Sequence, residues 1–395
     1  MTQPASTLTR TFQRFFDSEK SAGVLLLACT ALSLLLANSP WGGDYLALWQ
    51  FKVGPLSIEH WINDAGMAIF FLLIGLELER ELYSGELSSP QKALLPVVAA
   101  LGGAATPALI HYLFNHGTPT AAGFGIPMAT DIAFAVGALA ILGRRVPGSL
   151  KVFVVAFAVI DDLFAIVIIA IFYTAEIKGI YLAGALAVFA LLCGLSRFFR
   201  VMALAPYLAG GLVIWFLFLK SGVHATLAGV LLAFAIPFSA KDGDSRSPSH
   251  RLEHWLHLPV AFLILPLFAL ANTALVVGTD WLHMLSNPNS WGIVAGLVLG
   301  KPIGLTLFCW IAVWLGICRL PDSLNWRHLF GAGLLGGIGF TMSIFIANLA
   351  FAEQGALLNA SKMAILLAST LAGCLGLVWL AAYGAEKHRG GLAQD

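Results

Sequence analysis

Two adjacent aspartates, Asp161 and Asp162, stand in the middle of the apolar stretch VFVVAFAVIDDLFAIVIIAIFY. Each flank holds about 11 apolar residues, or roughly 17 Å of helix, which places the pair near the midplane of a membrane. A charge there costs about 2.5–3.5 kcal/mol, and two unpaired anions would cost more. At least one carboxylate must therefore be protonated, paired with a cation or bound to a metal ion. Because a carboxylate holds either a proton or a small cation, this pattern is typical of an ion carrier; a buried salt bridge without a transport role is the alternative.

Lys301, in GLVLGKPIGLTLF, is the one lysine that falls deep inside a predicted span. It is the expected partner of one of the aspartates, because a nearby carboxylate stabilises the charged form of a buried lysine. It serves either as a fixed counter-charge or as a proton carrier, and the sequence leaves both open.

Thr130 and Asp131 follow several helix-breaking residues in GFGIPMATDIAFAVGALAIL, and a second glycine-rich stretch, GAGLLGGIGFTMSIFI, lies in the other half of the chain. Breaks in a membrane helix leave free amides and carbonyls, which are tolerated where they line a cavity. Glycines that only allow close helix packing are the alternative. Two such segments in corresponding halves favour a transporter site. The breaking residues are Gly123, Gly125, Pro127, Gly331, Gly333, Gly336, Gly337 and Gly339.

Two groups of ionisable residues lie near the predicted cytoplasmic helix ends. In the first group, in LELEREL, the spacing of i, i+3 and i+4 puts three charges on one helix face. The second group, in RLEHWLH, combines an acid with histidines, which titrate near neutral pH. They are candidates for tuning a pH response, or else solvated helix ends. The residues are Glu77, Arg80, Glu81, Glu253, His254 and His257.

The composition predicts an all-α membrane protein that positions these groups within helices. Hydrophobic residues make up 59% of the 395-residue chain and charged residues 11%, whereas soluble domains carry about 25% charged residues. Mean hydropathy is +0.86. With a net charge of +1, nucleic-acid binding is not expected, and neither is a cofactor. The five scattered cysteines give no disulfide or metal-binding spacing.

Breaking the chain at charges and turn residues predicts twelve transmembrane helices in a single membrane domain, residues 1–395. The seventh and eighth are short and separated only by Lys220 and Ser221. The predicted spans lie near 13–37, 57–83, 93–115, 121–142, 149–173, 179–199, 204–219, 222–237, 252–277, 290–316, 328–351 and 358–384.

The distribution of basic residues predicts that both termini are cytoplasmic. With this orientation, 17 of the 22 lysines and arginines fall on the cytoplasmic side, four on the outer side and Lys301 within a span, as the positive-inside rule requires. Residues 41–58 then form a small hairpin on the outer surface, around a Val-Gly-Pro turn. Residues 239–251, the longest polar stretch, form a cytoplasmic loop.

Seven motifs spread along nearly the whole chain resemble those of the NhaA-type sodium/proton antiporter family: ATDIAF, AVIDDL, SGVHATLAG, RLEHWLH, ILPLFA, GKPIG and GIGFTMSIFIA. The resemblance implies inverted repeats, formed by spans three to five and ten to twelve. Spans four and eleven would cross at the midplane as extended chains flanked by half-helices. Asp131 and Lys301 would compensate the facing helix dipoles.

The same resemblance implies roles for the charged residues. Asp162 would be the main sodium or lithium ligand, with Asp161 and Thr130 close by, and Asp161 would pair with Lys301 in the proton-loaded form. Family members are homodimers of the bacterial inner membrane that move two protons inward for one sodium outward, so transport is electrogenic. Membrane lipid surrounds them, and the outer hairpin, here 41–58, contributes to the dimer. Glu77, Arg80, Glu81, Glu253, His254 and His257 match the region that governs pH activation.

One residue departs from the family pattern. Glu79 stands where a basic residue is common, so that Glu77, Glu79 and Glu81 follow within one turn, which concerns the pH set-point and not the exchange chemistry. Two other readings compete with the antiporter. A channel needs a continuous polar path, whereas this chain has isolated charges in apolar surroundings. An intramembrane aspartyl protease uses aspartates on two helices, whereas this pair lies on one.

Overall fold

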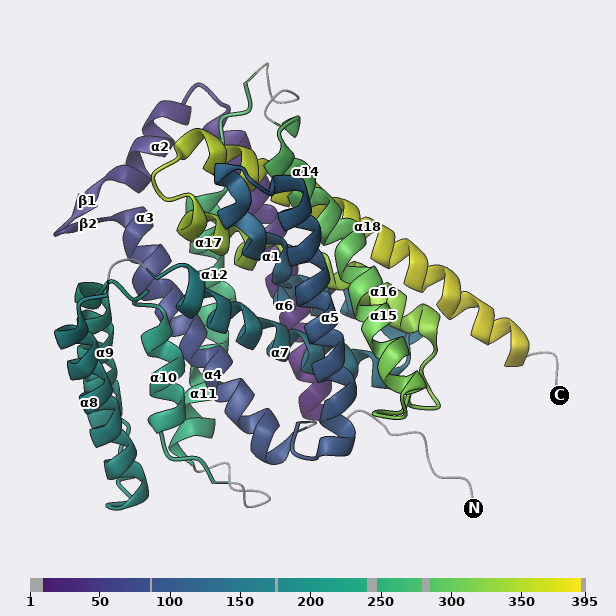
Figure 1. Cartoon of the computed structure of the whole chain (residues 1–395), viewed down its shortest axis with the longest axis horizontal. Helices are drawn as coiled ribbons and strands as arrows, with labels where there is room; N and C mark the ends of the chain where they lie inside the picture. Colours follow the sequence, from purple (N-terminus) through teal and green to yellow (C-terminus); the bar gives the residue numbers. More distant parts are fainter. Residues whose placement is uncertain (1–9, 86, 175–176, 240–246, 279–284, 392–395) are drawn as a thin grey trace. The chain divides into compact units, whose positions relative to one another are not determined.

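The computed structural model describes residues 10–85, 87–174, 177–239, 247–278 and 285–391. Over these ranges the chain is mostly helical (Figure 1), with one pair of two-residue strands. It forms two compact units. Unit 1 comprises residues 1–28, 89–165 and 277–395, and unit 2 comprises residues 29–88 and 166–276. The unit boundary falls inside two helices, α1 (Arg10–Ala37) and α7 (Gly148–Phe172), each of which continues from one unit into the other.

Unit 1 contains the first part of α1, most of α7 and helices from both ends of the sequence. A 3-10 segment, η2, precedes α6, and a π-helical turn, η5, leads directly into α15. The elements are α5 (Pro90–Asn115), η2 (Pro119–Met128), α6 (Ile132–Leu142), η3 (Gly143–Arg145), α14 (Pro288–Ala295), η5 (Gly296–Gly300), α15 (Lys301–Trp314), α16 (Trp326–Gly336), α17 (Phe340–Ala350) and α18 (Gly355–Gly391).

Unit 2 contains the strand pair, the remaining parts of α1 and α7, and the helices that follow. The elements are α2 (Gly42–Gln50), β1 (Lys52–Val53), β2 (Leu56–Ser57), α3 (Ile58–Trp61), η1 (Ile62–Gly66), α4 (Met67–Ser84), α8 (Gly179–Arg197), α9 (Ala205–Ser221), α10 (Leu227–Ala235), α11 (Pro248–Pro259), η4 (Val260–Ile264) and α12 (Leu265–Asn272).

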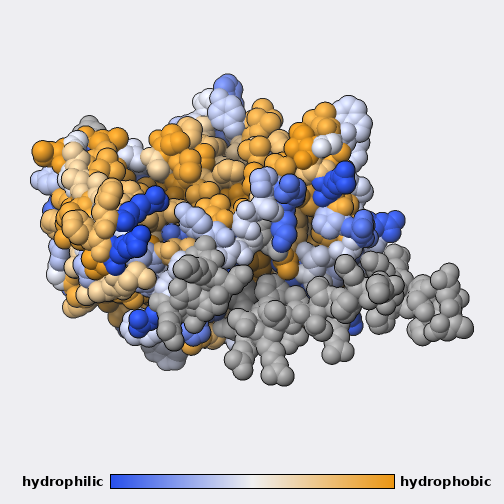
Figure 2. Space-filling view, turned by 90° about the horizontal axis from the view of Figure 1, so that it is seen from below, coloured by the Kyte–Doolittle hydropathy of each residue, from blue (hydrophilic) through white to orange (hydrophobic). Residues whose placement is uncertain are grey.

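Many helices are long and apolar enough to cross a membrane. Within the described ranges nine qualify, or ten when the bent pair α16 and α17 is taken as one span. Figure 2 shows apolar side chains (orange) over much of one face. Leucines at positions 186, 191 and 212 are among many large apolar residues that are exposed. Since lipid rather than water must cover such a surface, the chain is a multi-pass, all-α membrane protein.

Two helical stretches in unit 1 are broken. Between η2 and α6 the backbone at Ala129 and Asp131 is extended. Between α16 and α17 the chain bends by 49°. A Cβ atom on Gly337 would collide with the backbone oxygen of Leu297, so the second break depends on a residue without a side chain.

Close backbone contact fixes the start of α15. Gly102 on α5 and Gly304 on α15 face each other so tightly that a Cβ on either residue would strike the carbonyl oxygen of the other. Small residues allow membrane helices to approach in this way. Lys301 lies one turn before Gly304, so this crossing sets the position of its side chain.

The segment 41–58 and the polar loop 239–251 differ in part from the predictions. Residues 42–50 form helix α2, and the hairpin is limited to 52–57, where Gly54 adopts a φ of +68°. A short apolar run is compatible with a strand or a helix, and the run in this segment is helical. Of the predicted loop 239–251, residues 240–246 lie outside the described ranges, and α11 begins at Pro248. The Ser247 side chain caps that helix, accepting a hydrogen bond from the His250 amide.

Candidate functional site

A buried ion pair joins α7 to α15 in unit 1. Lys301 Nζ lies 2.7 Å from Asp161 Oδ2, and neither side chain has any exposed surface. A buried pair is maintained only when both partners are present, because removing one leaves an uncompensated charge. The predicted partnership between Lys301 and one of the aspartates is therefore formed through Asp161.

Asp162, the second carboxylate, is also fully buried. It points about 100° around the helix from Asp161, and its charge lies within electrostatic range of Lys301. Thr130, likewise buried, lies beside Asp161. In the described part of the chain, no group of three or more His, Cys, Asp or Glu residues could hold a metal ion. Two carboxylates and one hydroxyl are thus buried close together in unit 1.

The two broken stretches are tied together next to this pair. The Thr130 hydroxyl donates a hydrogen bond to the carbonyl of Gly336 (2.8 Å), the last residue of α16. The Asp131 amide donates to the carbonyl of Ile338 (2.7 Å). Carbonyls that the helix end leaves without a helical partner are satisfied by the other broken stretch.

Asp131 faces the beginnings of two helices. Its carboxylate accepts hydrogen bonds from the Phe134 amide in α6 (3.2 Å) and from the amide (3.0 Å) and hydroxyl of Thr341 in α17. A negative charge at a helix N-terminus is stabilised by the helix dipole, so one side chain here serves two helices. Thr341 was not singled out from the sequence, although its place just after GIG was a signal.

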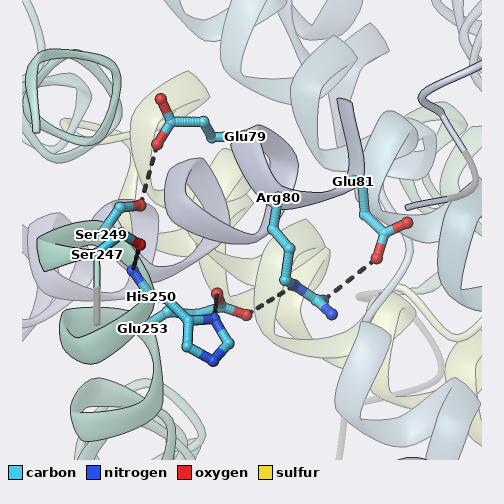
Figure 3. A network of polar contacts seen from close by, with 7 residues as sticks. All are labelled: Glu79, Arg80, Glu81, Ser247, Ser249, His250 and Glu253. Atoms are coloured by element: carbon cyan, nitrogen blue, oxygen red, sulfur yellow. Dashed lines mark hydrogen bonds and ion pairs between the residues drawn. The ribbon is translucent and has the colours of Figure 1, made fainter. Parts of the chain in front are cut away.

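A second cluster of charges lies in unit 2, between the end of α4 and the start of α11 (Figure 3). Arg80 forms ion pairs with Glu253 (Nε to Oε1, 2.9 Å) and with Glu81 (Nη2 to Oε1, 3.3 Å). Glu253 in turn lies 3.7 Å from His250 Nδ1. The Arg80 side chain is 38% exposed and that of Glu253 is 14% exposed, so water reaches this cluster.

Glu79 makes a separate contact in the same region. Its Oε2 accepts a hydrogen bond of 3.0 Å from the hydroxyl of Ser249, and both residues are buried. This contact, on a different face of α4 from Arg80, gives the two helices a second polar connection. Ser249 and His250 were missed in the sequence, although both lie within one turn of Glu253.

The remaining predicted residues of this region differ in their exposure and in their distance from the cluster. Glu77 is partly exposed and lies within electrostatic range of Arg80. His257, also partly exposed, lies within electrostatic range of Glu253. His254 is exposed, and the contacts drawn in Figure 3 involve other residues of α11, such as His250 and Glu253. The structure thus brings together most of the predicted inner group within unit 2.

Comparison with known proteins identifies the family. The profile of the family described as "Na+/H+ antiporter 1" matches residues 13–380. A protein of Dechloromonas aromatica named Na(+)/H(+) antiporter NhaA is 64% identical over 380 residues, covering 96% of this chain and 98% of its own. The equally named protein of Cytophaga hutchinsonii is 57% identical, covering 94% and 95%, and that of Shewanella loihica is 47% identical, covering 96% and 99%. These relatives are transporters and not enzymes, which rules out the protease reading. The chain belongs to the Na+/H+ antiporter 1 family.

Proposed function

We propose that this protein exchanges cytoplasmic Na+ or Li+ for external H+ by alternating access, with cation and protons competing for Asp161 and Asp162. The observation that carries this proposal is the fully buried Lys301–Asp161 pair beside the fully buried Asp162. Three ionisable groups in a dry setting carry at most one balanced pair, so the site favours gaining another positive charge. Either a sodium ion or a proton supplies it.

The ion pair between Lys301 and Asp161 competes with a cation for the same carboxylate. The Lys301 ammonium donates a hydrogen bond to the Asp161 carboxylate, so a cation that binds both carboxylates must displace the ammonium. Sodium held by Asp162, Asp161 and the Thr130 hydroxyl would restore neutrality, and Lys301 would return to Asp161 after the cation leaves. Lys301 either carries a proton itself or moves only as a counter-charge. One proton on an aspartate balances one sodium, so the electrogenic exchange of two protons for each sodium requires a second proton carrier, a role that Lys301 would fill in the first of these alternatives.

The broken helices support alternating access in this scheme. Asp131 holds the starts of α6 and α17, and Thr130 holds the end of α16. These contacts make the crossing a unit that can move as one piece. We propose that the breaks interrupt spans four and eleven, within inverted repeats of spans three to five and ten to twelve.

The remaining topology follows the predicted twelve spans. The nine long apolar helices and the bent pair account for ten, and the shorter α9 and α10 supply the seventh and eighth. Both termini then face the cytoplasm of a bacterial cell, and the protein lies in the lipid of the inner membrane. The 52–57 hairpin lies on the outer surface as part of a homodimer contact.

The inner cluster is proposed to regulate the exchange in response to pH. Two acids share one arginine, and one of these acids also faces a histidine, so the group responds jointly to protonation. The residues assigned to this response are Glu77, Arg80, Glu81, Glu253, His254 and His257, joined by Glu79, Ser249 and His250.

The test is the dissipation of a pH gradient in everted vesicles, followed by a fluorescent dye after addition of sodium, lithium or potassium. The wild type should respond to sodium and lithium much more than to potassium, and Asp162→Asn should abolish both responses. Asp44→Asn, which makes the same change at an exposed aspartate, is the control. Full activity of Asp162→Asn would overturn the site. Sodium flux that neither saturates nor moves protons would favour a channel.

A further inference from the structure

An aromatic ring lies over the charged end of Lys301. The centroid of the Phe157 ring is 5.5 Å from Lys301 Nζ, within the range of a cation–π interaction. Phe157 has no exposed surface. It precedes Asp161 by four residues, so both side chains lie on the same face of α7. The ammonium is therefore held between a carboxylate and an aromatic ring of one helix.

We propose that Phe157 is a positioning residue that retains Lys301 on Asp161 and thereby opposes cation binding. This inference rests on the proposed function, in which sodium displaces Lys301 from Asp161. The ring is not proposed as a ligand of the sodium ion. It acts through the lysine, by stabilising the contact between Lys301 and Asp161.

Two glycines leave room for the ring. A Cβ atom on Gly103 of α5 would lie 3.2 Å from the Phe157 ring and 3.7 Å from Lys301 Cδ. A Cβ atom on Gly336 of α16 would lie 3.1 Å from the ring and 3.6 Å from Thr130 Oγ1. The ring therefore fills the space between the lysine stem and the end of the broken helix. Because the ring has no exposed surface, it cannot turn away without displacing the groups around it.

The predicted effect has a definite sign. The quadrupole of the ring attracts a cation, more strongly when water is excluded. This attraction stabilises the ammonium at its present position, so loss of the ring weakens the competitor of sodium. We expect Phe157→Leu to lower the sodium KM by about threefold to tenfold, as cation–π energies imply, with kcat unchanged or reduced. A merely structural defect would reduce the amount of active protein and leave KM unchanged.

The experiment measures sodium KM and kcat in proteoliposomes at one fixed pH for the wild type, Phe157→Leu and Phe153→Leu. Phe153 is stacked on Phe157 (centroids 6.5 Å apart) and is also buried, so its substitution removes a similar apolar volume one turn farther from the lysine. We expect a lower KM for Phe157→Leu only. An unchanged KM, or an equal decrease in Phe153→Leu, would overturn the inference.

Binding of lithium to the purified protein, measured by calorimetry, provides a second readout that does not need transport. Phe157→Met, which keeps a long apolar side chain without a ring, replaces Phe157→Leu if that variant folds poorly. Lithium affinity should be higher in Phe157→Met than in the wild type. In a protein that already carries Lys301→Gln, adding Phe157→Met should not change the lithium affinity, since the effect of the ring requires the ammonium. If Phe157→Met raised the lithium affinity equally in the Lys301→Gln background, the ring would not act through the lysine. If Asp162→Asn retains activity, the proposed site fails; if it is inactive while Phe157→Leu has wild-type KM, only the role of Phe157 fails.

Discussion

The charged side chains of unit 1 and those of unit 2 are stabilised in different ways. In unit 1, Lys301 and Asp161 are fully buried and contact each other directly. In unit 2, Arg80 is shared by Glu81 and Glu253, and Glu253 also faces His250. The first region depends on one contact in a dry setting, whereas the second distributes its charges over several partners near water.

This difference has consequences for both regions. A buried pair has no substitute when one partner is lost, so it suits a step in which one charge replaces another. A partly exposed network is screened by solvent, and each of its contacts contributes little. Substitutions in unit 1 should therefore have large effects on transport and stability, and those in unit 2 should shift its regulation.

The largest contrast is expected between Lys301→Met and Arg80→Met, which remove one cation of similar length from each region. Lys301→Met leaves Asp161 buried without its cation and should destabilise the protein by about 3–5 kcal/mol. Arg80→Met should cost less, about 1 kcal/mol, because the Arg80 side chain is 38% exposed and water screens its ion pairs. Thermal unfolding in detergent and pH-gradient dissipation in vesicles measure both effects. Equal losses of stability would break the comparison.

A smaller contrast concerns the helix caps of the two units. Asp131→Ala removes the acceptor for amides at the starts of α6 and α17, whereas Ser247→Ala removes the cap of α11 alone. A lost cap costs about 0.5–2 kcal/mol, so Asp131→Ala should destabilise the protein about twice as much and should also slow sodium exchange. Unfolding midpoints and transport rates check this. An Asp131→Ala variant with wild-type stability would show that the two helix starts do not depend on this carboxylate.

The smallest effect is expected for Glu79→Gln, which keeps an acceptor for Ser249 but removes a carboxyl group that lies within electrostatic range of Glu253. A like charge opposes ionisation of its neighbour. Without it, the pH of half-maximal exchange should fall by less than about one unit, and the rate at the optimum should stay within about twofold. The measurement is the pH profile of exchange, with Ser249→Ala as a control that breaks the hydrogen bond but keeps the charge. A rise in the midpoint would contradict this role.

The chemistry of the site was more predictable from the sequence than its geometry. Asp161, Asp162 and Lys301 stand out because isolated charges in apolar spans are costly wherever the helices pack. Their pairing through Asp161 in particular depends on how α15 crosses α5 at Gly102 and Gly304, which is a tertiary contact. The partners of Thr130 and Asp131 are mostly backbone groups. Because every residue has polar backbone groups, the sequence does not identify which ones these side chains contact.

The boundaries of the helices were predicted less well than their presence. The stretch 41–58 reads as two apolar segments around a turn, but its first half is the helix α2, because short apolar runs do not distinguish strand from helix. The contact between Glu79 and Ser249 requires α11 to begin at Pro248, inside a segment that the polar composition of 239–251 assigned to a loop.

The central claim is that sodium and protons compete for one buried carboxylate pair. Its most direct test is the apparent KM for sodium, measured in vesicles at a series of pH values. Competition predicts that this KM rises steadily as pH falls, while the rate at saturating sodium changes much less. A sodium KM that does not depend on pH, in vesicles whose exchange still requires Asp162, would contradict the account.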